Sequence, residues 1–350
     1  MRNFTFKRQL LFVMFMLLGC LSIQAADDGL ITKQITIKLD KAGTLPDKIG
    51  STKKKQITNL KIIGEINGTD WCFIREMAGC DYNCEKTGGK LSMLDLSDAK
   101  IVKGGLPYIK YNGGVYTSND KLGYAAFSDC SGLTSLTIPS SVTSIGEYAF
   151  NGCSGLTSLT IPSSVTSIGE SAFYGCSGLT SLTIPSSVTS IGELAFFGCS
   201  GLTSFTIPSS VTSIGESAFF GCSGLTSFTI PSSVTSIGWG AFCGCSGLTS
   251  IYVYTEKLPN MGSDVFDGCD AKKCTVYVPK GTYDDYWLSE FGYFENIVEF
   301  DPTGINNVIT SNDAKELSRY SVNGQRLSAP TKGLNIVKYS DGSVKKVAVQ

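Results

Sequence analysis

The chain contains no histidine among its 350 residues. Histidine is the commonest general base in enzymes and the commonest metal ligand, because its pKa lies close to neutral pH. Its absence excludes Ser-His-Asp and Cys-His catalysis within this chain, and it excludes histidine-based metal centres. We therefore expect no cofactor.

Charged side chains are also scarce, at 17% of the sequence, and the formal net charge is −1. Lysine and arginine are absent between residues 130 and 250. A balance so close to neutral gives no electrostatic basis for attraction to nucleic acid or to an acidic membrane surface. We therefore expect no nucleic acid among the partners.

Long apolar runs are missing except at the N-terminus, where Leu10 to Leu18 follows the basic residues Arg2, Lys7 and Arg8. This run is too short to span a bilayer and is typical of an export signal. No later segment is long and apolar enough to span. The sequence therefore predicts a chain exported to the cell surface or outer membrane, or secreted, with no transmembrane span after the signal.

Two cleavage sites fit this signal. Ile23-Gln24-Ala25 suits ordinary signal peptidase and makes residues 1–25 the signal peptide. Leu17-Leu18-Gly19-Cys20 resembles a lipobox, which would place a lipid on Cys20 and anchor the chain in the outer membrane. Both alternatives stay open on the sequence.

The middle of the chain repeats with a period of 23 residues. Residues 130–152 read CSGLTSLTIPSSVTSIGEYAFNG, and the phrase restarts at Cys153, Cys176, Cys199, Cys222 and Cys245. Self-similarity at this fixed period is typical of leucine-rich repeats, whose units bury their apolar faces only when they are stacked. The sequence therefore predicts a repeat solenoid over residues 130–250.

Within one unit, Leu133, Leu136 and Ile138 follow an L-x-x-L-x-L spacing. Alternation along a short strand places Leu136 and Ile138 inside and Ser135 and Thr137 outside. The proline that follows Ile138 ends the strand, because it cannot donate to a continuing ladder.

The second half of the unit turns the chain back into the core. Val142 and Ile145 point inward, Gly146 permits a tight bend, and Ala149-Phe150 is expected in a short helical turn. The equivalent aromatic side chains of successive units should stack as one column: Phe150, Phe173, Phe196, Phe219 and Phe242.

Divergent copies flank the array. The spacing persists at Ile57–Ile62 and Leu91–Leu96, and Val276–Pro279 is expected as the last strand. Terminal units of a solenoid need atypical, more polar faces to remain soluble. We assign residues 26–129 to an N-terminal cap of divergent repeats and residues 251–300 to a C-terminal cap.

The phrase LTSLTIPSSVTSIGEYAFNGCSGL and its copies resemble the BspA-type leucine-rich repeats of bacterial surface proteins, over roughly residues 55–300. The resemblance implies a right-handed coil of short parallel β-strands with short helical turns. It also implies exposure at the cell surface, where some members bind host matrix or plasma proteins or other cells. The ligand stays open, because one such scaffold serves many partners.

The composition changes after a linker at residues 301–310. Residues 311–350 are predicted to form a small β domain, with Asp341-Gly342 turning a hairpin into Val344–Val349. Asn323-Gly324-Gln325-Arg326 followed by Lys332-Gly333 resembles the C-terminal sorting domain of type IX secretion substrates. A small β domain without a sorting role is the alternative.

Thirteen cysteines in an exported chain raise the question of disulfides. The cysteines that recur with the repeat should form a column with neighbours about 4.8 Å apart and parallel side chains, which disfavours disulfide geometry. We expect these to be reduced core thiols. The disulfide candidates are Cys80 with Cys84, Cys269 with Cys274, and Cys72 with an unknown partner. Zinc would tolerate the Cys80–Cys84 spacing, but no second pair matches it.

Three surfaces of the array are candidate binding sites. The first is the outward strand face, a flat, uncharged set of hydroxyls that can hydrogen-bond sugars, extended peptides or water. The alternative is that these side chains are simply good solvated strand residues. The set comprises Ser135, Thr137, Ser158, Thr160, Ser181, Thr183, Ser204, Thr206, Ser227 and Thr229.

The second candidate is an acidic row at one position of the repeat: Glu147, Glu170, Glu193 and Glu216. It could dock a basic partner or cations, or it could be an exposed residue copied with its repeat. The third is a drifting position with aromatic members, which could be an adhesive edge or packing between coils: Asn151, Tyr174, Phe197, Phe220 and Cys243, with Tyr148, Leu194 and Trp239 nearby.

These observations favour a non-enzymatic, adhesin-like exported or cell-surface binding protein that presents a solenoid face to an extracellular protein or glycan. A structural spacer or surface-layer module without a specific ligand is the alternative. Asp284-Asp285 is the nearest approach to a catalytic carboxylate pair, but it lies in a predicted capping segment rather than a cleft. The sequence does not predict an oligomeric state.

Overall fold

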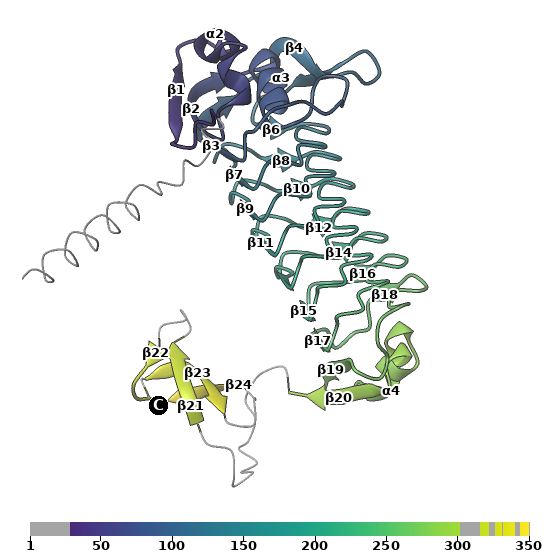
Figure 1. Cartoon of the computed structure of the whole chain (residues 1–350). Coiled ribbons are helices and arrows are strands. Elements are labelled where there is room, and N and C mark those ends of the chain that lie inside the picture. Colours follow the sequence, from purple (N-terminus) through teal and green to yellow (C-terminus); the bar gives the residue numbers. More distant parts are fainter. Residues whose placement is uncertain (1–28, 302–315, 322–325, 331, 340–343, 350) are drawn as a thin grey trace, which may run out of the picture.

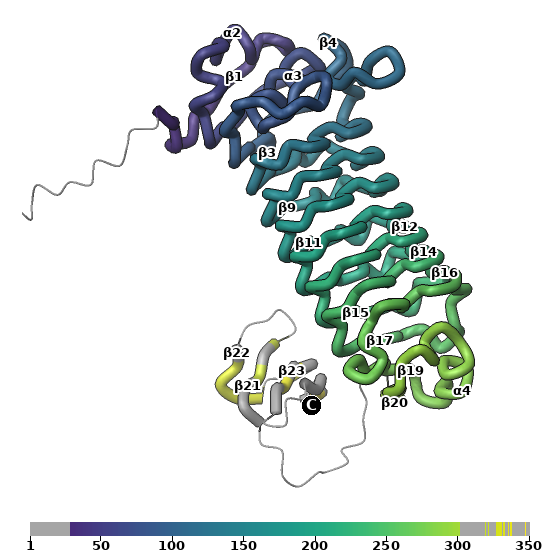
Figure 2. Tube along the Cα trace, turned by 45° about the vertical axis from the view of Figure 1, so that its right-hand side comes forward, coloured from purple at the N-terminus to yellow at the C-terminus, as the bar shows by residue number. Residues whose placement is uncertain are grey.

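A computed structural model describes residues 29–301, 316–321, 326–330, 332–339 and 344–349. Residues 29–301 form an elongated stack of coils, with helix α3 at the N-terminal end and helix α4 at the C-terminal end (Figure 1). In the tube view, one coil follows another along the whole array (Figure 2). The predicted signal peptide, Cys20 and most of the predicted linker lie outside the described residues.

One wall of the stack is an 11-stranded sheet in which every neighbouring pair is parallel. Each coil adds one strand, because the 23-residue period returns the chain to the same register: Leu136 lies opposite Leu159. In sheet order the strands are β1 (Ile35–Leu39), β2 (Asn59–Ile66), β3 (Met93–Ile101), β7 (Ser135–Thr137), β9 (Ser158–Thr160), β11 (Ser181–Thr183), β13 (Ser204–Thr206), β15 (Ser227–Ile230), β17 (Ser250–Val253), β19 (Thr275–Pro279) and β20 (Asn296–Phe300).

This sheet runs beyond the array at both ends. The divergent copies at Ile57–Ile62 and Leu91–Leu96 contribute to β2 and β3, and Leu94 pairs with Leu136 as in the regular repeats. Val276–Pro279 lies in β19, as expected, but it is not the last strand, because β20 pairs with it on the outer side. Both flanks are therefore continuous with the solenoid.

The opposite wall is a sheet of two-residue strands that the sequence did not predict. Ile145 pairs with Ile168, and this pairing recurs along the stack. In sheet order the strands are β18 (Asn260–Met261), β16 (Ser236–Ile237), β14 (Ser213–Ile214), β12 (Ser190–Ile191), β10 (Ser167–Ile168), β8 (Ser144–Ile145) and β6 (Lys121–Leu122).

The expected helical turn at Ala149-Phe150 is replaced by non-helical turns, and residues 130–250 contain no helix. Tyr148 adopts a left-handed φ of 56°, which a right-handed helix cannot accommodate. The amides of this segment instead bond to the following coil, as Phe150 N does to Ala172 O at 2.7 Å. These turns therefore connect neighbouring coils rather than closing on themselves.

Stacked phenylalanines fill the core as expected. Their ring centroids lie 5.1–6.0 Å apart and their planes are nearly parallel. The column gains Phe127 at one end and Phe266 at the other. Offset stacking of buried rings adds to the stabilisation from apolar burial.

A column of buried cysteine thiols lies beside these rings. Each thiol donates to the carbonyl of a core phenylalanine 26 residues earlier, which is one repeat period plus three residues, from Cys153 to Phe127 O at 3.0 Å through Cys245 to Phe219 O at 3.2 Å. Cys269 makes the same bond, to Phe242 O at 3.4 Å, and so continues the thiol column instead of standing apart as a disulfide candidate. Burial raises the pKa of Cys176 and Cys222 to about 12.

The described residues contain no disulfide, and the thiols of Cys72, Cys80, Cys84 and Cys274 are free. Cys80 and Cys84 share a partner, because Nη2 of the buried Arg75 donates to both sulfur atoms, at 3.3 and 3.9 Å. Burial raises the pKa of Cys80 to about 11, although the nearby guanidinium opposes the shift. A disulfide between these two residues stays a prediction.

The N-terminal end is covered by α2 (Leu45–Ile49), η1 (Lys53–Lys55), α3 (Gly68–Met77) and the hairpin of β4 (Gly104–Ile109) and β5 (Val115–Thr117). Helix α3 begins at a capping box formed by Asn67 and Asp70. Its Trp71 Nε1 donates to Ala126 O at 2.8 Å, and its Arg75 Nη1 donates to Ala125 O at 2.9 Å. These hydrogen bonds hold the N-terminal cap against the first coil.

The C-terminal end carries α4 (Tyr283–Trp287) and η2 (Glu290–Tyr293). Further along the chain, β21 (Glu316–Ser321), β22 (Arg326–Leu327), β23 (Gly333–Tyr339) and β24 (Val344–Val349) form an antiparallel sheet in the order β22-β21-β23-β24. Strands β23 and β24 pair antiparallel, as expected for Val344–Val349, and the predicted turn at Asp341-Gly342 lies outside the described residues. Within the described ranges, no helix is both long and apolar enough to cross a membrane.

Candidate functional site

The hydroxyl side chains singled out in the sequence lie on the outer face of the 11-stranded sheet, which we call the outer strand face. None of them is buried, whereas the residues between them, such as Leu136 and Leu159, are. The strands pair in register, so Thr137 lies opposite Thr160 and Thr183 opposite Thr206. The face therefore carries two parallel rows: Ser135, Ser158, Ser181, Ser204 and Ser227, and Thr137, Thr160, Thr183, Thr206 and Thr229.

Hydrogen bonding separates these hydroxyls from the other threonines of the repeat. The residue three positions before each outer-face threonine donates to the carbonyl of the preceding coil, as Thr157 Oγ1 does to Thr134 O at 3.0 Å. The equivalents are Thr134, Thr180, Thr203, Thr226 and Thr249. Among the described residues, the hydroxyls of the outer strand face have no such partner within the chain, so they are available to a ligand.

Aromatic residues continue the threonine row at its C-terminal end. Thr229 lies opposite Tyr252, which in turn lies opposite Tyr277. The two tyrosine rings stack with centroids 4.6 Å apart and planes 6° apart. Burial, and next the neighbouring Tyr277, raises the pKa of Tyr252. Phe300 packs edge-on against Tyr254 at 5.2 Å. Sequence reasoning missed this cluster, although Tyr252 follows Thr229 by one 23-residue period.

A cluster of charges borders the outer strand face at its N-terminal end. Asp95 lies opposite Thr137, and Lys61 lies opposite Asp95. Lys61 Nζ is 3.1 Å from Asp95 and 2.7 Å from Asp98. Hydrogen bonds to Asp98 and Asp95 raise the pKa of Lys61 and keep it charged. Between this ion-pair cluster and Tyr252 the face carries no formal charge.

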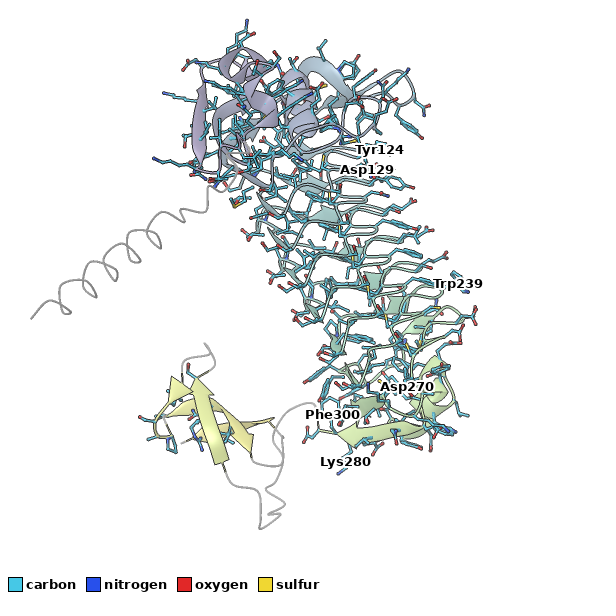
Figure 3. All side chains as sticks on the ribbon, viewed as in Figure 1. Tyr124, Asp129, Trp239, Asp270, Lys280 and Phe300 are labelled. Atoms are coloured by element: carbon cyan, nitrogen blue, oxygen red, sulfur yellow. The ribbon has the colours of Figure 1, made fainter. Side chains whose placement is uncertain are left out.

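The acidic row occupies another edge of the stack. Glu147, Glu193 and Glu216 are exposed, and Glu170 is half-buried and accepts from Tyr148 Oη at 3.3 Å. Tyr124 and Trp239 occupy the same repeat position one period before and one period after the row. Both lie along this edge of the array in Figure 3.

The drifting aromatic position forms a ladder of its own. Tyr174 stacks on Phe197 at 4.6 Å, and Phe197 stacks on Phe220 at 4.8 Å. Tyr174 is 36% exposed, while Phe197 and Phe220 are half-buried, as are Asn151 and Cys243 at the ends. The ladder therefore packs neighbouring coils together, as one interpretation of the sequence expected, and leaves its rings partly exposed; an adhesive role for it stays a prediction.

Clusters of potential metal ligands are not a feature of the described residues. They contain no group of three or more Cys, Asp or Glu side chains placed to hold a metal ion. Asp284 and Asp285 are both exposed on the short helix α4. The neighbouring Tyr286 is buried and donates to Thr255 O at 2.8 Å, which fixes the cap.

The repeat geometry agrees with the outcome of a comparison with known families. The BspA type leucine rich repeat region matches the chain in six copies, over residues 120–249, 166–288 and 213–313. The chain belongs to this family. The matched residues take in the whole outer strand face and the acidic row, so both surfaces are part of the BspA-type repeat region itself.

Several solved structures are similar to this BspA-type chain. The Treponema pallidum leucine rich repeat protein has 34% identity over 47% of this chain and 74% of its own, with a TM-score of 0.42. A leucine-rich repeat protein from Bacteroides ovatus has 21% identity over 79% and 74%, with a TM-score of 0.39. A leucine rich cell surface protein from Faecalibacterium prausnitzii has 22% identity over 76% and 87%, with a TM-score of 0.29. No curated protein matches the chain.

Proposed function

We propose that this BspA-type chain is an exported, non-enzymatic binding protein, adhesin-like, that holds an extracellular protein or glycan on its outer strand face. The observation that carries the proposal is the set of unpaired hydroxyls on that face. Hydroxyls at several other positions of the repeat bond to the preceding coil, as Thr157 does to Thr134 and Ser164 does to Val142. The outer-face hydroxyls make no bond of this kind and contribute little to holding the coils together.

Export is the second part of the proposal. The basic and apolar N-terminal segment supports it, with cleavage after Ala25 or lipidation of Cys20 as the two routes. The C-terminal segment 311–350 supports a type IX sorting role through its Asn323-Gly324-Gln325-Arg326 and Lys332-Gly333 motifs. Deletion of residues 311–350 is expected to leave the protein inside the cell envelope. Unchanged surface display of the truncated chain would rule out the sorting role.

A binding screen tests the function. The full-length mature protein is immobilised and exposed to matrix proteins, plasma proteins and glycans, together with a variant carrying Thr160→Glu, Thr183→Glu and Thr206→Glu. The three carboxylates introduce charge and bulk in the middle of the outer strand face, so binding should fall by about tenfold or more. A matched control places the same charges on another exposed row, as Ser163→Glu, Ser186→Glu and Ser209→Glu.

Equal binding by the outer-face variant and the control would show that the face is not the site. A structural spacer is the second candidate function, because the copies are nearly identical even at exposed positions. A screen in which nothing binds the unmodified protein would favour the spacer.

A further inference from the structure

We propose that the ligand of the outer strand face is a neutral glycan that lies across the strands, with one sugar ring packed against Tyr252. The inference rests on the proposed function, since it names the class of ligand for the same face. Three features of the face carry it: the chemistry of its hydrogen-bonding groups, its lack of charge, and the aromatic side chain that ends it.

Hydrogen bonding on this face favours a sugar over a peptide. Serine and threonine hydroxyls both donate and accept, as sugar hydroxyls do. The main-chain groups of β9, β11 and β13 are already engaged with neighbouring strands. A peptide laid on the face therefore cannot add a strand to the sheet, which is the mode that gives extended peptides their affinity.

Charge selects a neutral glycan over an acidic one. Residues 130–250 contain no lysine or arginine, so nothing there compensates a sulfate, phosphate or uronate group. Lys61, which borders the N-terminal end of the face, is already held between Asp95 and Asp98. The free energy of removing a ligand charge from water would be uncompensated along this surface.

Tyr252 supplies the apolar contact that hydroxyls alone lack. Tyr252 is the equivalent of Thr229 in the next coil. Its side chain is much longer than that of threonine, so it projects above the sheet at the end of the threonine row. Because one ring face of Tyr252 packs on Tyr277 across the strand pairing, its other face is turned toward Thr229. A sugar presents C–H groups on one face of its ring, and these pack against an aromatic ring while its hydroxyls reach Thr229 and Thr206.

The ring is fixed before any ligand arrives. Tyr277 stacks behind Tyr252, and Phe300 lies edge-on to it at 6.4 Å with an interplanar angle of 88°. Phe300 lies at the C-terminal end of the stack, beside Lys280 in the view of Figure 3. A preformed contact of this kind lowers the entropic cost of binding.

The length of the face fits an oligosaccharide. From β7 to β15 the rows cross four strand spacings of about 4.8 Å, or roughly 19 Å. One strand spacing is close to the length of one sugar unit in an extended glycan. Successive units therefore meet successive serine and threonine pairs.

Affinity electrophoresis tests the inference with full-length protein in gels that contain laminarin, mannan, dextran or xylan, and in gels that contain heparin or polygalacturonate as charged counterparts. At least one neutral polysaccharide should retard the protein, and the charged ones should not. Tyr252→Thr installs the residue of the preceding coils and is expected to weaken the retardation about tenfold. Thr160→Val with Thr183→Val and Thr206→Val removes hydroxyls at constant shape and should weaken it similarly.

Ser163→Ala with Ser186→Ala and Ser209→Ala is the matched control and should bind as the unmodified protein does; circular dichroism of all variants reports folding. The inference is overturned if no neutral polysaccharide retards the protein, if charged ones do so more strongly, or if a folded Tyr252→Thr variant binds equally well. A matrix protein whose binding is lost in the Thr→Glu variant above would then leave the proposed function standing with a protein ligand. If neither a neutral polysaccharide nor a matrix protein binds through the outer strand face, both the inference and the proposed function are wrong.

Discussion

Threonine has two roles in each coil of this molecule. Thr180 donates its hydroxyl to the coil before it, whereas the hydroxyl of Thr183, three residues later, has no hydrogen-bond partner among the described residues. Sequence alone could not separate these roles, because both residues recur with the same period. Thr180 lies just before β11 and Thr183 lies within it, and their different hydrogen bonding marks the surface that we propose to bind.

The cysteine column leads to a prediction about stability. Cys199→Ala removes the thiol bond to Phe173 O and leaves a small cavity in the core, so the free energy of unfolding should fall by about 1–2 kcal/mol. Urea denaturation followed by circular dichroism measures the change. Cys243→Ala, at a half-buried position outside the column, is the control and should cost less. An equal loss in both variants would contradict the role given to the column.

The thiol column also predicts a pH dependence. Burial raises the pKa of these thiols above the ordinary value of 9.0, to about 12 for Cys176 and Cys222. A raised pKa means that the folded chain holds the proton more tightly, so the stability it contributes is complete below pH 9.0 and is lost as the pH rises toward 12. Chemical denaturation across this window should show a declining midpoint. The decline should be smaller when Cys176, Cys199 and Cys222 are replaced by serine.

In the turns between strands, the backbones of neighbouring coils lie so close together that some positions have no room for a side chain and require glycine. A Cβ on Gly201 would lie 2.3 Å from Ser177 O and 3.2 Å from Leu179 O, both of them backbone atoms of the preceding coil. Gly201→Ala should therefore destabilise the array by about 3 kcal/mol or more. Thermal unfolding measures this. The exposed neighbour provides the control, since Ser200→Ala should stay within about 0.5 kcal/mol of the unmodified protein.

At the level of elements, the strands of the large sheet were predictable because alternation of residues such as Leu136 and Thr137 specifies an inside and an outside. The opposite sheet was not, because the two-residue strand Ser144–Ile145 is too short to show any period. The helical turn was wrongly predicted because Ala149-Phe150 suits a helix, while the left-handed Tyr148 before it is fixed by bonding between coils. β20 was missed because it lies outside the 23-residue period.

The stability of the whole molecule should be close to a sum of contributions from similar repeats and from the interfaces between them. Removing one repeat tests this. Deleting residues 176–198 joins Gly175 to Cys199 and restores the same sequence phrase, so the shortened chain should fold with an unchanged strand signal per coil. Its unfolding midpoint should fall modestly, by the contribution of one unit and one interface between units. Deleting residues 176–187 is the out-of-register control and should abolish cooperative folding. Equal behaviour of the two deletions would contradict in-register stacking as the source of stability.

At the scale of the whole molecule, the sequence predicted the class of fold and the position of the outer strand face. It did not show that the face ends in Tyr252 and Tyr277, because that requires the register between β17 and β19. Nor did it place Cys269 in the thiol column, since its spacing from Cys245 is 24 residues rather than 23. The extra residue between Cys245 and Cys269 hides in the sequence that the two cysteines are equivalent. In the structure, the longer coil still places Cys269 in the thiol column.

Hydroxyl-radical footprinting of the protein with its bound ligand tests most directly whether the outer strand face is the binding surface. Each of the two candidate surfaces has exposed side chains that hydroxyl radicals oxidise. Met93 and Tyr254 border the outer strand face. Tyr174 and Trp239 lie along the edge that carries the acidic row and the aromatic ladder. Oxidation of Met93 and Tyr254 should fall when ligand is bound, with Tyr174 and Trp239 unchanged. Protection of Tyr174 and Trp239 alone would contradict the account and place binding on the opposite edge.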